Sequence, residues 1–320
     1  MIITRGWPKK KRSTTEFVLS KDMLDLKQFT PQAMVDIRPL LALQQYRSCD
    51  YSIGGIYMWR EFFGEKYAVE DGMLICTVEY FDEGHCYTMP VGCGDLRSAL
   101  MKIKRDAMER GLPFRFCSLT SKGLEELKAI LGEPTQLKEH REWADYLYPY
   151  ENFLGYHGKK LVTPRNHCNR FVRDYPQYVY EAITRDNIEE ATAFLAMKAD
   201  NLEKTSPIAI EDHIRAVEVM SSYFEFGFIG GILKVDGSTV GVTVGEIIGD
   251  TLYVQIEKAL TEYSGAYPML AQLFARQAQR PGVDYINRED DSGDEGLRHS
   301  KTEYRPCELI MKYTADFDIQ

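Results

Sequence analysis

A predicted strand from Thr251 to Ala259 carries two ionisable side chains near its end, Glu257 and Lys258. Alternation along a strand puts Gln255 on the same face as Glu257. Tyr253 shares that face, and the other face then carries Leu252, Val254, Ile256 and Lys258. A strand covered on both sides holds Gln and Glu together only where they pair or line a cleft. Clefts in α/β proteins open at the carboxyl ends of strands, so we predict a cleft here.

Each polar side chain of this strand has a role in acyl transfer if the cleft is present. Glu257 can take the proton of an attacking amine or hydroxyl as a general base. Lys258 can stabilise a developing oxyanion where the chain splays enough for it to turn inward. We expect Tyr253 and Gln255 to contact the substrate. A buried, hydrogen-bonded pair of Gln255 and Glu257 is the structural alternative.

A second group of charges follows a strand predicted over 283–287 and leads into a helix predicted over 295–302. Arg298 and Lys301 are three residues apart and therefore share one face of that helix. They either brace the acidic loop by pairing with Asp290 or Asp291, or meet a phosphate. The acidic residues also suit the N-terminus of the helix, and their spacing fits a calcium loop only in part, so no metal is expected. Around the substrate we place Asn287, Asp290, Asp291, Arg298 and Lys301.

Basic residues gather in two segments of an otherwise acidic chain, whose formal net charge is −9. Such a chain meets nucleic acid or anionic lipid only through a local basic patch. Residues 1–15 form a predicted flexible basic tail, able to contact phosphates of RNA or an anionic membrane. Residues 158–177 are predicted to be either a solvated basic helix between two lobes or a phosphate-binding surface. We expect tRNA phosphates to bind there through Lys159, Lys160, Arg165 and Arg170.

Length and composition are those of a globular protein with two domains or one unusually large domain, because the chain has 320 residues and is 44% hydrophobic. Seven scattered cysteines lack zinc spacing and indicate free thiols. The sequence contains neither a signal peptide nor an apolar run of the ~18 residues that a membrane span needs. We therefore expect a cytoplasmic protein.

Apolar periodicity and turn signals predict an α/β (α+β) fold with a mixed sheet and flanking helices in each of two lobes. The first lobe covers residues 16–157, and its last strand is expected from Trp143 to Tyr148. The second covers residues 178–320 in the order strand, helix, helix, three hairpin-linked strands, helix, strand, helix, strand. Its final strand is expected from Cys307 to Tyr313.

The order of elements from Tyr178 to Tyr313 resembles the GNAT acyltransferase fold. An ordered series of motifs extends the likeness over most of the chain; it includes Asp145-Tyr146-Leu147-Tyr148, Gly158-Lys159-Lys160, Ile256-Glu257-Lys258-Ala259 and Tyr285-Ile286-Asn287-Arg288-Glu289-Asp290-Asp291. The series resembles an uncharacterised bacterial family grouped with the C-terminal domain of phosphatidylglycerol lysyltransferases. The resemblance implies two GNAT-like lobes in tandem, as in the Fem-type aminoacyltransferases.

The resemblance implies that an aminoacyl group moves from a tRNA ester to an amine or a lipid hydroxyl, without a cofactor. A CoA-using GNAT enzyme binds pyrophosphate with a [QR]-x-x-G-x-[GA] loop before its central helix. The matching stretch begins with acidic Glu262 and ends with bulky Tyr267, and Pro268 removes a donor, so CoA is not expected. The alternatives are a CoA-dependent N-acyltransferase with a nonstandard loop and a non-catalytic protein that holds a small ligand.

Overall fold

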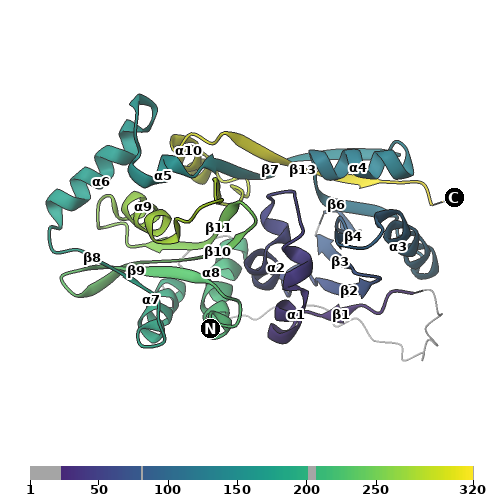
Figure 1. The fold of residues 1–320 in the computed structure, drawn as a ribbon, viewed down its shortest axis with the longest axis horizontal. Coiled ribbons are helices and arrows are strands. Elements are labelled where there is room, and N and C mark those ends of the chain that lie inside the picture. Colours follow the sequence, from purple (N-terminus) through teal and green to yellow (C-terminus); the bar gives the residue numbers. More distant parts are fainter. Residues whose placement is uncertain (1–22, 81, 201–206, 320) are drawn as a thin grey trace, which may run out of the picture.

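The computed structural model describes residues 23–80, 82–200 and 207–319. Their strands form one 13-stranded sheet in the order β1-β2-β3-β4-β6-β13-β7-β12-β11-β10-β9-β8, with β5 paired to β3. Figure 1 shows this sheet running through two lobes, with helices against each part of it. The predicted α/β fold with mixed pairing and flanking helices is confirmed, and the strands form one continuous sheet instead of a separate sheet in each lobe. The basic tail predicted over residues 1–15 lies outside the described residues.

The first lobe is built on hairpins and well-capped helices. Asp95 accepts a hydrogen bond from the Ser98 amide and so starts one helix, which ends where Gly111 takes a φ of +64°. In chain order the lobe contains β1 (Lys27–Gln28), α1 (Pro31–Leu41), η1 (Cys49–Tyr51), α2 (Ile53–Trp59), β2 (Lys66–Glu70), β3 (Met73–Tyr80), β4 (Gly84–Tyr87), β5 (Val91–Gly92), α3 (Leu96–Arg110), β6 (Arg115–Thr120) and α4 (Ser121–Leu131).

The second lobe follows a long strand, β7 (Gln136–Pro149), and largely matches the predicted order of elements. It contains α5 (Glu151–Gly155), η2 (Lys159–Leu161), α6 (Val162–Asp174), β8 (Val179–Ala182), α7 (Ile188–Asp200), α8 (Pro207–Val219), η3 (Met220–Ser222), β9 (Ile229–Val235), β10 (Ser238–Ile248), β11 (Thr251–Ala259), α9 (Ala266–Ala278), β12 (Tyr285–Asn287), α10 (Glu295–Glu303) and β13 (Glu308–Asp316). None of the described helices is both long and apolar enough to cross a membrane.

Two strands join the lobes, and both are longer than predicted. β13 lies between β6 and β7 and pairs antiparallel with each of them. Leu147 near the end of β7 pairs with Glu308 on one side and with Asn287 of β12 on the other. The first part of β7 was not predicted, because residues 136–142 are mostly polar and lack apolar alternation.

Two large apolar clusters cover the sheet. One cluster is continuous between the lobes: it contains Met34 and Ile75 of the first lobe and Val244 and Ile256 of the second. The other lies on the opposite face of the second lobe, beneath α5, α6 and α9, and includes Val254. A strand at the junction therefore contributes side chains to both cores, and any polar residue on it must be paired or face a cavity.

Candidate functional site

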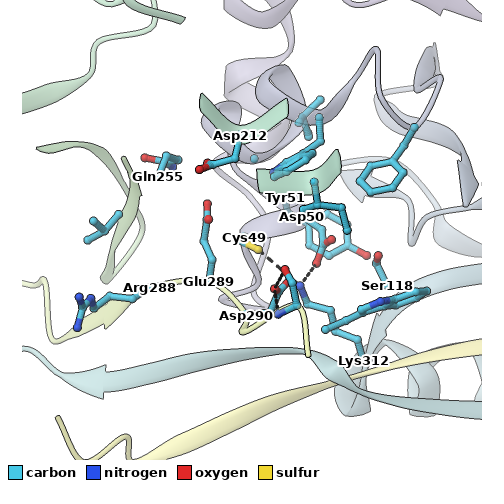
Figure 2. Close-up of a pocket in the computed structure, with 18 of the residues that line it drawn as sticks. Cys49, Asp50, Tyr51, Ser118, Asp212, Gln255, Arg288, Glu289, Asp290 and Lys312 are labelled. Carbon is cyan, nitrogen blue, oxygen red and sulfur yellow. Dashed lines mark hydrogen bonds and ion pairs between the residues drawn. The ribbon is translucent and has the colours of Figure 1, made fainter. Parts of the chain in front are cut away.

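A cavity of about 810 Å³ lies between the two lobes. The first lobe lines it with α2, β3 and part of β7, and the second with β11, α8, α10 and the loop after β12. Figure 2 shows polar side chains converging on this space from both lobes. The lining carries eight carboxylates against five lysine or arginine side chains, so the cavity is acidic.

The side chains of β11 do not alternate as predicted, because Gln255 is the extra residue of a β-bulge. Adjacent residues of β10 pair with Val254 and Ile256 and skip Gln255. Val254 and Ile256 consequently pack in different cores. The predicted common face for Val254, Ile256 and Lys258 is therefore wrong. The bulge shifts the alternation by one residue, and Glu257 and Lys258 both reach the cavity lining.

Gln255 also lines the cavity, but its hydrogen-bond partner is Glu246 and not Glu257, the partner considered from the sequence. Its amide donates to the Glu246 carboxylate at 3.0 Å, and its own Oε1 has no hydrogen-bond partner. Glu246 also accepts from the Gly54 amide at the start of α2, at 2.7 Å. Burial raises the pKa of Glu246 to about 7. This contact joins the lobes, because α2 belongs to the first and β10 to the second.

The two residues predicted to be catalytic are both in ion pairs. Glu257 pairs with Arg288, the first residue after β12. Burial opposes the charge of Arg288, but Glu257 and nearby tyrosines outweigh it and raise its pKa. Lys258 pairs with Asp212 of α8. All four side chains line the cavity, so the predicted pair does lie there together.

The loop after β12 carries Glu289, an acidic residue that was not predicted to belong to the site. Glu289 has a φ of +56°, a conformation that non-glycine residues rarely adopt. Its carboxylate points into the cavity toward Asp212 (Figure 2) and forms no hydrogen bond or ion pair with the described residues. Burial raises the pKa of Glu289 to about 8, and neighbouring Asp290 adds to the effect. The available signal in the sequence was its position two residues after a strand that ends at the cleft.

Asp290 and Lys301 shape the same loop. The Asp290 carboxylate accepts from the Ser292 amide at 2.8 Å and from its hydroxyl at 2.9 Å. Lys301 donates to the carbonyl oxygens of Arg288, at 2.6 Å, and Asp290. Burial lowers the pKa of Lys301 and raises that of Asp290. Both residues line the cavity, and their present bonds hold the loop in place. Their contact with a substrate stays a prediction.

Four other predicted contacts have structural partners and do not line this cavity. Arg298 forms two hydrogen bonds of 3.0 Å with Asp291, which is the bracing alternative. Burial opposes the charge of Asp291, but Arg298 and Tyr146 lower its pKa to about 2. Asn287 donates to the Arg47 carbonyl and to Asp145, and Tyr253 accepts from Gln44 at 2.7 Å.

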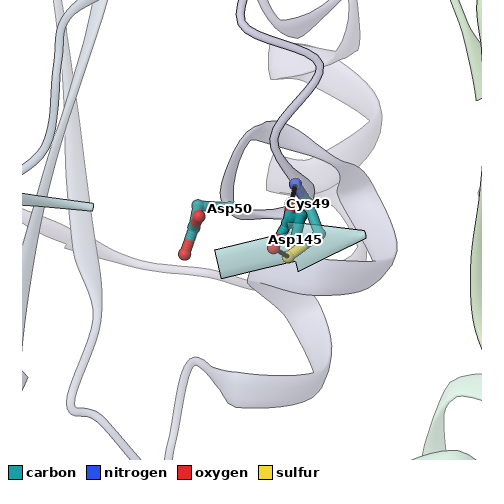
Figure 3. Close-up of side chains that lie close together, drawn as sticks. All are labelled: Cys49, Asp50 and Asp145. Atoms are coloured by element: carbon teal, nitrogen blue, oxygen red, sulfur yellow. Dashed lines mark hydrogen bonds between the residues drawn. The ribbon is translucent and has the colours of Figure 1, made fainter. Parts of the chain in front are cut away.

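A buried cluster beneath the cavity was not anticipated. Asp145 of β7 accepts from the Cys49 amide at 2.7 Å and lies 2.7 Å from Lys312 of β13. Lys312 also lies 2.6 Å from Asp50. Figure 3 shows Cys49, Asp50 and Asp145 close together, as in a metal site. The Lys312 ammonium contacts all three and supplies the positive charge between them.

The predicted tRNA-binding residues lie along η2 and α6, away from the cavity lining. Lys159, Lys160 and Arg170 are exposed. Arg165 instead donates to the carbonyl oxygens of Tyr156 and Gly158, both at 2.9 Å, and fixes the turn before α6.

The start of α9, the counterpart of a pyrophosphate-binding loop, is covered by α6. A Cβ added at Gly265 would lie 2.4 Å from the backbone oxygen of His167. The backbone of α6 therefore occupies the space next to this turn, and Pro268 removes one amide of the first helical turn.

Comparisons with known proteins agree with this fold. Residues 41–316 match the family described as "Phosphatidylglycerol lysyltransferase, C-terminal". A solved protein of unknown function from Bacteroides thetaiotaomicron is 34% identical, with a TM-score of 0.85 over 92% of this chain and 100% of that one. The C-terminal domain of a putative lysylphosphatidylglycerol synthetase from Agrobacterium fabrum is 13% identical, with a TM-score of 0.62 over 90% of this chain and 92% of that one.

Two further matches are more distant. The structure of FemX is 9% identical, with a TM-score of 0.56 over 91% of this chain and 97% of that one. An uncharacterised protein of Mycoplasmoides gallisepticum is 22% identical over 177 residues, 54% of this chain, and the match covers 56% of that relative. The chain thus spans about half the length of the curated relative. Family and fold are those of acyltransferases of the lysyltransferase type, and the chain belongs to the phosphatidylglycerol lysyltransferase C-terminal domain family.

Proposed function

We propose that the protein transfers an aminoacyl group from aminoacyl-tRNA to an acceptor that carries an amine or a hydroxyl, and that the transfer takes place in the cavity between the lobes. One observation carries the proposal: Glu289 projects into that cavity without a partner, and its pKa of about 8 is close to neutrality. A general base works best when its pKa lies near the working pH. The family match supports the reaction class.

We assign proton transfer to Glu289 instead of Glu257. The carboxylate of Glu257 is already held in an ion pair with the Arg288 guanidinium. Glu289 has no such cation in contact, and its left-handed backbone aims it into the open space. Glu257 then acts as a positioning residue that holds Arg288, the neighbour of Glu289 in the chain.

The proposed reaction needs no cofactor, because the tRNA ester is already activated. The nitrogen or oxygen of the acceptor attacks the ester carbonyl carbon, and Glu289 takes the proton that the acceptor loses. Lys258, which lines the cavity and pairs with Asp212 before substrate binds, is the cation assigned to the oxyanion of the tetrahedral intermediate. The C–O bond to the terminal ribose breaks, and Glu289 returns the proton to that ribose oxygen. The products are an amide or ester and free tRNA.

The test is transfer of a radiolabelled aminoacyl group from mixed charged tRNA. Two acceptor pools are supplied in parallel: small metabolites of a cell extract and vesicles that contain phosphatidylglycerol. Glu289→Gln should lower the rate by about 10²–10⁴-fold, while Glu295→Gln, an exposed acid on α10, serves as the matched control. Transfer by wild type with a fully active Glu289→Gln variant would remove Glu289 from the mechanism. No transfer from any charged tRNA would favour the ligand-binding alternative.

A further inference from the structure

The first-lobe side of the cavity is a wall of aromatic rings, which the proposed chemistry does not use. Four rings line it in sequence, Trp59, Phe63, Tyr80 and Trp143. Trp59 and Phe63 have centroids 5.8 Å apart, Phe63 and Tyr80 4.8 Å, and Tyr80 and Trp143 4.8 Å. We call these four residues the aromatic wall. Such ring faces carry negative potential and attract organic cations.

A carboxylate without a partner lies on the same side of the cavity. Glu65 lines the space, and its side chain makes no hydrogen bond or ion pair with the described residues. Burial raises the pKa of Glu65 well above its usual value; Asp50 adds to the effect, and Arg60 opposes it without reversing it. A buried carboxyl group left unpaired costs folding free energy, which a bound cation would recover.

The first-lobe side of the cavity has acidic side chains without matching basic ones. The lining residues between 41 and 143 include Asp50, Glu65 and Glu142 and contain neither lysine nor arginine. Arg60 acts electrostatically on Glu65 from outside the lining, but its guanidinium already pairs with Glu61 and Glu218. Lys312 of β13 lies between Asp50 and Asp145. Glu65 therefore has no ion pair of its own among the described residues, and a ligand cation can supply the countercharge.

We infer that the aromatic wall and Glu65 form a binding site for the ammonium head of a small organic cation. The rings hold the alkyl groups around the nitrogen through cation–π contacts, and Glu65 supplies the countercharge. That this compound is the acceptor rests on the proposed function. In that case it is a bifunctional compound, a diamine or an amino alcohol, because the nitrogen bound at Glu65 stays protonated. Its second amine or hydroxyl then faces Glu289 in the same cavity.

Intrinsic fluorescence can test the site directly. The chain has three tryptophans, Trp7, Trp59 and Trp143. In a Trp7→Phe background both remaining indoles belong to the aromatic wall. This protein is titrated with n-butylammonium and choline, and with 3,3-dimethylbutan-1-ol, the uncharged carbon analogue of choline. We expect a saturable change with the cations and at least ~10-fold weaker binding of the neutral analogue, the size of a desolvated cation–π contact.

Variants test whether the fluorescence change comes from cation binding at Glu65 and the aromatic wall. Glu65→Gln should weaken cation binding about 10-fold or more, whereas Glu109→Gln, an exposed acid on α3, should leave it unchanged. Cation affinity should rise with pH as the Glu65 carboxyl group ionises, and the rise should vanish in Glu65→Gln. Trp59→Leu is the second variant; it keeps Trp143 as reporter and should weaken binding several-fold. Melting curves check that each variant is folded.

Equal affinity for the neutral analogue, or unchanged affinity in both Glu65→Gln and Trp59→Leu, would overturn the inference. The binding assay contains no tRNA, so its result is independent of transfer. Saturable cation binding without any transfer would retain this site and contradict the proposed function. Transfer without cation binding would retain the function and contradict this site.

Discussion

Arg288 and Glu257 form an ion pair across the gap where β12 and β11 separate. The two strands pair in parallel only from Thr251 and Tyr285 to Tyr253 and Asn287. Beyond that point the guanidinium of Arg288 lies over the ring of Tyr304, 4.5 Å from its centroid. The pair therefore fills a space that would otherwise separate the strands, and it fixes the start of the loop that carries Glu289.

Breaking this pair should destabilise the protein. Arg288→Met leaves Glu257 buried without its countercharge and should lower the free energy of unfolding by about 3–5 kcal/mol. The double variant Arg288→Met/Glu257→Gln should lose less than the sum of the two single changes, because both charges are then gone. Urea denaturation of all four proteins measures the coupling. Additive losses would contradict the ion pair.

The pH dependence of transfer should report Glu289. A base with a pKa of about 8 is mostly protonated at pH 7 and ionised at pH 9, so the single-turnover rate should rise over this interval. Glu289→Asp should keep a pH-dependent rate, whereas Glu289→Gln should give a low and flat one. Single-turnover measurements with pre-charged tRNA separate this step from tRNA binding. A pH-independent wild-type rate would argue for another base.

Ionisation of the buried Glu246 carboxyl group should lower the free energy of unfolding as the pH rises. Its pKa is about 7 when folded against 4.5 in the unfolded chain, so the native state binds more protons between these values. From pH 4.5 to 7 this group alone should cost about 3 kcal/mol, at ~1.4 kcal/mol per pH unit. Glu246→Gln keeps an acceptor for the Gly54 amide and should remove that dependence. Melting temperatures of both proteins from pH 5 to 8, in one ionic strength, provide the comparison.

tRNA binding, if it uses α6, should depend on its exposed cations. Replacing Lys159, Lys160 and Arg170 by Ala should weaken binding and reduce the slope of log affinity against log salt by about one for each lost phosphate contact. A control triple variant changes three exposed cations of the first lobe, Lys66, Arg97 and Lys122. Equal slopes in the two triple variants would exclude α6 as the tRNA surface.

Acetyl-CoA should not bind in a saturable manner at low micromolar concentrations. Its pyrophosphate would have to displace the α6 backbone from Gly265, and the acidic cavity lining would repel its phosphates. Titration calorimetry measures this directly, with a CoA-using acetyltransferase as the positive control. A clear micromolar isotherm would favour the CoA-dependent alternative.

The sequence was most informative where local signals are strong. β11 (Thr251–Ala259) is the strand expected over the same residues, and α10 (Glu295–Glu303) is the helix expected over 295–302, because turn residues directly precede each of them. α2 was missed because it begins Ile-Gly-Gly, and glycine disfavours helices. Glycine is required at position 55 because a Cβ there would lie 2.2 Å from the Cys49 carbonyl oxygen. This contact depends on the folded structure and is not visible in the local sequence.

The candidate site was predicted in part for the same reason. Glu257, Lys258, Gln255, Asp290 and Lys301 do line one cavity. The bulge at Gln255 depends on pairing with β10, so strict alternation assigned the faces wrongly. Glu289 and the aromatic wall come from segments more than 140 residues apart, and only the packing of the two lobes brings them to one space.

β13 is among the last segments to be synthesised, and it completes both the sheet and the buried cluster beneath the cavity. Lys312 reaches Asp50 and Asp145 from a strand inserted between β6 and β7, which leave the ribosome some 160 residues or more earlier. Until residues 308–316 emerge, the edges of β6 and β7 have no partner and the two aspartates have no countercharge. The first lobe therefore cannot mature ahead of the second, as separate domains do during translation. A nascent chain that stalls before β13 exposes two strand edges, a ready target for chaperones and proteases.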